Sequence, residues 1–73
     1  MTNRAYLAII EPSATGFSAY VPDLPGCIAS GDTLERTEQN IRDGIAFHLE
    51  GMIAEGMPLP EPVSQSRVLE VVG

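Results

Sequence analysis

The acidic side chains are the groups in this sequence with the clearest capacity for chemistry. Those that could act together are Asp23, Asp32, Glu38, Asp43 and Glu50. Hydrolysis with two divalent metals requires several carboxylates converging within a few ångströms. Here one acid lies in a proline-rich loop, one precedes a helix, and three point at differing angles around that helix. Carboxylates dispersed in this way are typical of a solvated face, so we expect no catalytic residue, no bound metal and no enzymatic activity.

His48 and Cys27 are the only residues of their types. Neither has a second His, Cys or Ser at a spacing that suits a metal site or a nucleophile–base pair. His48 falls about 40° from the centre of the apolar helix stripe, which favours a packed histidine. Cys27 follows a glycine at a strand start and is expected to be a small buried residue, with redox sensing as the second interpretation. No cofactor is predicted.

Two aromatic residues stand where the patterns predict solvent. Phe47 lies about 140° from the centre of the helix stripe, beside Asp43 and Glu50. Tyr20 points away from the inward-facing residues of its strand, toward a sheet face that one helix cannot cover. Aromatic residues are enriched at interfaces. We therefore predict contacts with a partner or a second copy at Tyr20, Asp23, Asp43, Phe47 and Glu50, the alternative being accidental exposure.

The elements that must position these residues begin with three short strands. Residues 4–11 alternate with both faces apolar, which predicts a central strand. A turn cluster at 12–16 joins it to a second strand at 17–21, with one face apolar and the other wetter. Two prolines and a glycine in 22–26 predict a rigid loop. A short apolar strand at 27–30 follows.

A long helix is predicted next. Asp32 and Glu35 fit a capping box, and Thr33 is the alternative cap. Gly56 and the prolines behind it end the helix near Glu55. Five apolar residues fall within one stripe that covers the sheet: Leu34, Ile41, Ile45, Leu49 and Met52.

After the helix, residues 57–64 read as an extended crossing and residues 68–72 as a final strand. The predicted fold class is thus α+β, in the order β-β-β-α-β, with one long helix on one face of an antiparallel sheet. The 73 residues leave room for one small core, so a homo-oligomer, a dimer or tetramer, is expected.

Composition narrows the classes of partner. The net charge is −6, there is no lysine, and the four arginines are scattered among acids. Nucleic-acid binders cluster Lys and Arg, so no direct nucleic-acid binding is expected, and a basic protein partner is favoured. The charge could also serve only solubility. Because no signal-peptide core and no membrane-spanning run is visible, we expect a cytoplasmic protein with no membrane partner.

Four runs of the sequence resemble the HicB family of antitoxins. They are GFSAYVPDLPGC at 16–27, GDTLE at 31–35, EQNIR at 38–42 and HLEG at 48–51. Their order and spacing, together with the proline-rich exit and closing strand, cover nearly the whole chain.

The resemblance implies a partial RNase H-like fold and a partner. HicB proteins neutralise HicA, a small basic mRNA-cleaving toxin, so the resemblance implies an antitoxin of a type II toxin–antitoxin system that occludes a HicA-like toxin. A DNA-binding segment usually follows this domain in the family. Residues 1–73 are expected to be a single HicB-like domain without a C-terminal DNA-binding domain. The alternatives are an orphan oligomeric regulatory or scaffold module and, more remotely, a metal-dependent nuclease.

Overall fold

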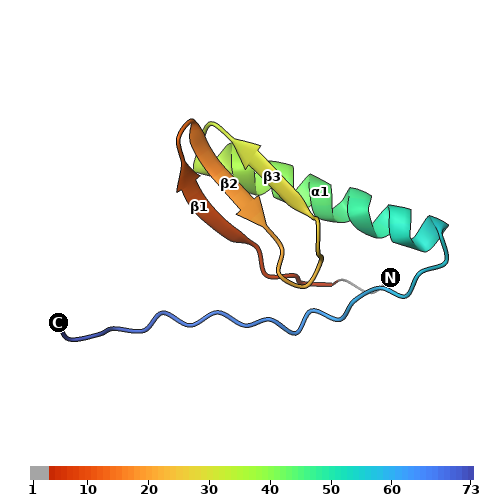
Figure 1. Ribbon diagram of the computed structural model, residues 1–73. Helices are drawn as coiled ribbons and strands as arrows, with labels where there is room; N and C mark the ends of the chain where they lie inside the picture. The colour runs from red at the N-terminus through yellow and green to blue at the C-terminus, as the bar shows by residue number, and fades with distance from the viewer. Residues whose placement is uncertain (1–3) are drawn as a thin grey trace.

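Three strands and one helix form the ordered body of the molecule (Figure 1). In the computed structural model, which describes residues 4–73, they are β1 (Ile9–Ser13), β2 (Gly16–Tyr20), β3 (Ile28–Gly31) and α1 (Leu34–Ala54). The sheet is antiparallel in the order β1-β2-β3, and α1 covers one of its faces. This confirms the α+β prediction of three strands followed by one long helix. Residues 1–3, where the chain was predicted to carry no leader, lie outside the described residues.

The first strand is placed differently from its prediction. It begins at Ile9 rather than at residue 4, and it includes Pro12, which pairs with Phe17. The turn is reduced to two residues, Ala14 and Thr15. The expectation of a central strand is wrong, because β1 lies at the edge of the described sheet. An edge position explains the proline, since a missing N–H on the outer side removes no bond of the ladder.

The hairpin, the third strand and the helix meet closely at two glycines. Gly16 has φ +149°, and a Cβ added there would lie 2.3 Å from the carbonyl oxygen of Gly31. A Cβ on Gly31 would lie 2.7 Å from Oγ1 of the fully buried Thr37. Only glycine therefore allows β2, β3 and the first turn of α1 to approach this closely.

The helix is capped at both ends by its own sequence. The Thr33 hydroxyl accepts a hydrogen bond from the Arg36 amide at 3.0 Å, so Thr33 is the N-cap. The predicted Asp32–Glu35 capping box is wrong, because the Thr33 side chain already occupies the position that Asp32 would fill. At the other end Gly56 has φ +70° and its amide binds the carbonyl of Ile53. The helix thus ends where it was predicted to end.

A small core lies between α1 and the sheet. Its buried apolar members are Ala19, Val21, Leu24, Cys27 and Ile41. Burial of Cys27 confirms its predicted role as a packed residue and raises the pKa of its thiol, which keeps the sulfur protonated and unreactive. Ile45 and Leu49 of the predicted stripe pack against this core, whereas Leu34 at the helix start is 47% exposed.

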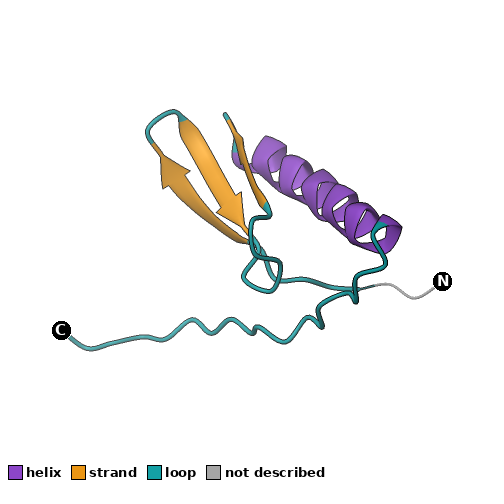
Figure 2. Cartoon of the chain, turned by 45° about the vertical axis from the view of Figure 1, so that its right-hand side comes forward, coloured by secondary structure: helices purple, strands orange, loops and turns teal. Residues whose placement is uncertain are grey.

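The predicted fourth strand is absent from the described residues. Residues 57–73 are extended but belong to no sheet, and they run past the base of the three strands (Figure 2). The prediction failed because it rested on alternation within 68–72, and a strand needs a neighbouring edge to satisfy its backbone groups. In this structure the segment reaches no such edge, so the observed order is β-β-β-α.

Candidate partner-binding site

The proline loop between β2 and β3 is built from two consecutive turns. The Leu24 amide donates to the Val21 carbonyl at 3.1 Å, and the Cys27 amide donates to the Leu24 carbonyl at 3.0 Å. A proline follows the first residue of each turn, where its fixed φ suits the geometry, and Gly26 supplies φ +86° in the second. Leu24 is completely buried. The predicted turns of this loop are confirmed, and the buried Leu24 side chain anchors the loop in the core.

Asp23 projects from this loop onto the segment that follows the helix. Its carboxylate accepts from the Ser64 amide at 2.9 Å and from the Ser64 hydroxyl at 2.8 Å. The backbone hydrogen bond from Ser64 is the main cause that lowers the pKa of Asp23 below its ordinary value. Tyr6 also donates to the Pro60 carbonyl nearby. Asp23, predicted as a partner contact, therefore also holds residues 57–64 against the loop.

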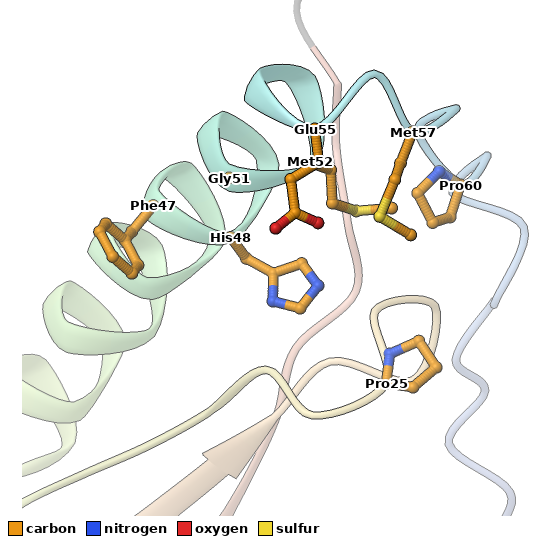
Figure 3. Close-up of a pocket in the computed structure, with 8 residues that line it drawn as sticks. All are labelled: Pro25, Phe47, His48, Gly51, Met52, Glu55, Met57 and Pro60. Carbon is orange, nitrogen blue, oxygen red and sulfur yellow. The ribbon is translucent and has the colours of Figure 1, made fainter.

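A groove opens between the C-terminal half of α1, the proline loop and the start of this segment (Figure 3). It measures about 550 Å³. Gly51 leaves space on the helix side, because it carries no side chain. Figure 3 shows His48 pointing from the helix toward Pro25. The lining is Pro25, Phe47, His48, Gly51, Met52, Glu55, Met57 and Pro60.

Phe47 stands at the rim of this groove and is 78% exposed, which confirms its predicted place on the wet side of α1. Asp43, Phe47 and Glu50 are spaced i, i+4 and i+7, so they share one face of the helix, and all three are exposed. The expectation that Asp43 and Glu50 point at differing angles around the helix is therefore wrong. Gln39 donates to Asp43 at 2.9 Å and orients its carboxylate. We call Asp43, Phe47 and Glu50 the acidic face. Three of the five predicted contacts are thus brought together.

Tyr20 lies elsewhere, on the sheet face that the helix leaves open. It pairs across the strands with Ile9 and Ile28, and Ile28 is 75% exposed. Since cross-strand partners point to the same face, these three side chains form an apolar row on the outside of the sheet. The structure therefore separates the predicted contacts into the acidic face, the Asp23 loop and this outer row.

The groove itself was not predicted. Its residues come from a loop, a helix and an extended segment, and their convergence depends on how the chain folds back after Gly56. The only signal in the sequence was Phe47. Within residues 4–73 no group of three His, Cys, Asp or Glu side chains could hold a metal. No helix in the same range is long and apolar enough to cross a membrane.

Comparison with known proteins identifies the family. Residues 6–71 match the model of the HicB-like antitoxins of bacterial toxin–antitoxin systems. The chain belongs to the HicB-like antitoxin family. The fold of this HicB-like chain is similar to folds in two solved antitoxin structures. It matches a chain of the HicA3–HicB3 toxin–antitoxin complex with a TM-score of 0.72 and 35% identity, covering 82% of this chain and 70% of that one. It matches the HicB3 antitoxin with a TM-score of 0.67 and 37% identity, covering 78% of this chain and 42% of the HicB3 chain.

Sequence relatives of this HicB-like chain come from a phage and a cyanobacterium. An uncharacterized 14.9 kDa protein of Haemophilus phage HP1 is 40% identical over 62 residues, which are 82% of this chain and 47% of the phage protein. A UPF0150 protein of Synechocystis is 39% identical over 57 residues, which are 77% of this chain and 72% of the Synechocystis protein. The HicB-like chain therefore spans about half the length of the phage relative.

Proposed function

We propose that this HicB-like chain is the antitoxin of a type II toxin–antitoxin pair and neutralises a small basic HicA-like toxin by covering its RNA-binding surface. The observation that carries the proposal is the acidic face, in which an exposed Phe47 stands between two carboxylates at the rim of an apolar groove. Membership of the HicB-like antitoxin family and the likeness to the HicA3–HicB3 complex support the same role.

The chemistry of this face suits a basic protein. An aromatic anchor that enters a desolvated pocket provides most of the affinity at many interfaces, while surrounding charges speed encounter and fix orientation. Here Asp43 and Glu50 flank the anchor, and Glu55 lies within the groove. A net charge of −6 extends the attraction over the whole chain. Binding of this kind requires no catalysis by the antitoxin, and it takes place in the cytoplasm where mRNA is cleaved.

The alternative functions make different demands on the same surfaces. A metal-dependent nuclease needs converging carboxylates, and the described residues contain no such group. An orphan scaffold module without a toxin would need only the outer row of Ile9, Tyr20 and Ile28 for self-association. The acidic face has no role in that second function, so a test of Phe47 separates the two.

The test is binding to a HicA-like toxin encoded beside this chain, measured by calorimetry with a catalytically inactive variant of that toxin. Phe47→Asp should weaken binding by about 2 kcal/mol or more, roughly thirtyfold, because the aromatic anchor is lost. Ile53→Asp is the matched control, since Ile53 is 63% exposed on a different side of the same helix. Equal affinity of the wild type and Phe47→Asp would reject the acidic face as the toxin-binding surface. Absence of any complex with the wild type would reject the antitoxin role.

A further inference from the structure

Residues 68–72 have the composition of a strand but no strand to pair with. Val68, Leu69, Val71 and Val72 are each at least 79% exposed. Such a run of β-prone apolar residues is unusual on a solvated surface, and a single extended segment is not stable in water without a partner edge. The segment therefore requires an edge elsewhere.

The β3 edge of the sheet is partly blocked by the helix. The Asn40 side chain of α1 donates to the Ser30 carbonyl at 2.8 Å. That carbonyl faces away from β2, because Pro12 has no N–H to donate to Phe17 and the alternation of bonded pairs then leaves Ser30 unbonded to Ser18. A helix side chain thus binds one outward group of the β3 edge, which is one way in which proteins protect an exposed strand.

Among residues 4–73 no strand pairs with the outer side of β1, and the hydrogen-bonding groups of that edge can be located. Because bonded and non-bonded pairs alternate across an antiparallel sheet, an outward Ser30 means that Ser18 bonds to Glu11 of β1. Ile10 and Pro12 then direct their backbone groups outward. Ile10 offers both an N–H and a carbonyl, while Pro12 offers only a carbonyl. An added strand would therefore bind beside Ile10 and the residues before it.

A hollow beside the β1 edge could receive side chains of the added strand. The helix packs mainly on β3 and β2, and it leaves a space of about 270 Å³ between residues 4–8 and α1. Ala5, Ala8, Ile41 and Ile45 provide apolar walls. Arg4, Glu38 and Arg42 also line the space. In an added strand Leu69 and Val71 would share one face, which suits the apolar walls, and Glu70 would face the opposite way.

The geometry points to a second copy of this chain as the provider of that strand. Asp23 fixes the chain at Ser64, and the nine residues 65–73 then extend up to about 30 Å. Figures 1 and 2 both show this segment leaving its own sheet rather than turning along β1. We propose that residues 68–72 pair with the β1 edge of a second copy, which returns its own segment in the same way. Such a reciprocal exchange closes a two-fold dimer.

The test uses the wild-type chain without any toxin, so its result is independent of the proposed antitoxin function. Light scattering should give twice the 7.8 kDa mass of one chain. Hydrogen exchange of the Ile10 amide should slow as the protein concentration rises over about two decades, because the bond forms between copies.

Two proline pairs identify the strand. Leu69→Pro with Val71→Pro removes the N–H groups on one side of the segment, and Val68→Pro with Glu70→Pro removes those on the other. Since an edge strand bonds on one side only, at least one pair should return the mass to that of one chain. Tyr20→Ala on the outer row is the control and should remain dimeric. Circular dichroism checks that the helix is retained in every variant.

Three results would overturn the exchange. They are a mass of one chain at every concentration, a dimer that both proline pairs leave intact, and slow exchange at Ile10 that does not depend on concentration. The last result would place residues 68–72 on the β1 edge of their own chain.

Discussion

The proline loop and the segment 65–73 both lack regular secondary structure, yet they differ in almost every other respect. The loop closes two turns on itself and buries Leu24 completely. Within residues 4–73 the segment makes side-chain hydrogen bonds only to its own residues, through Arg67, and its apolar side chains face solvent. The loop has fewer β-prone residues but more backbone hydrogen bonds and more burial. Attachment of an irregular segment to the core thus depends on an anchored apolar side chain and satisfied amides, not on strand propensity.

Removing the buried Leu24 side chain should have the largest effect and is the strongest test of this difference between the loop and the segment. Leu24→Ala should lower the free energy of unfolding by about 2 to 5 kcal/mol, because it leaves a cavity in a core of five buried apolar residues. Leu69→Ala is the matched control and should change the stability of the unassociated chain by less than about 0.5 kcal/mol. Urea unfolding at low protein concentration measures both. Similar losses in the two variants would show that residues 65–73 are as well packed as the loop.

A backbone substitution tests the second turn of the loop. Gly26→Ala should cost about 1 to 3 kcal/mol, because φ is +86° there and an L-residue is strained in that conformation. No atom lies within 4 Å of the added Cβ, so the loss would come from the backbone alone. Gly51→Ala, also without a neighbour but in the helix interior, should instead stabilise by up to about 1 kcal/mol. Equal effects at the two glycines would contradict the assigned turn.

The smallest expected effect concerns the Asp23 contact, which joins the two regions. The pKa of Asp23 is lowered in the folded state, so its carboxylate adds stability above its unfolded pKa and loses it as the pH falls below about 4. The Ser64 amide should therefore exchange faster in acid, relative to its intrinsic rate. In Asp23→Asn that protection should no longer depend on pH in this range. An unchanged pH dependence in the variant would assign the effect to another group.

The sequence predicted most elements because local signals defined them. Pro22, Pro25 and Gly26 specify turns, and Gly56 specifies the end of the helix, whatever the rest of the chain does. The exposure of Phe47 followed from helical period alone. Leu24 could not be predicted as the anchor, since nothing local distinguishes a loop leucine that turns inward from one that turns outward.

The features that were missed or wrong depend on distant parts of the chain. The groove needs Pro25 and Pro60 to meet the helix, which only the tertiary fold arranges. The edge position of β1 and the absent fourth strand are linked, because a strand is central only if a neighbour lies on each side. Alternation in 68–72 indicates a strand, but it carries no information about which edge, or which copy, completes the ladder.

The contact between Asn40 and Ser30 has a consequence for how far this sheet can grow. Because the Asn40 side chain binds an outward carbonyl of β3, strand addition is favoured at the β1 margin. When two copies exchange segments reciprocally, each gives one segment and receives one, so no unpaired segment is left to recruit a third copy. One amide group thus helps to direct pairing to a single margin.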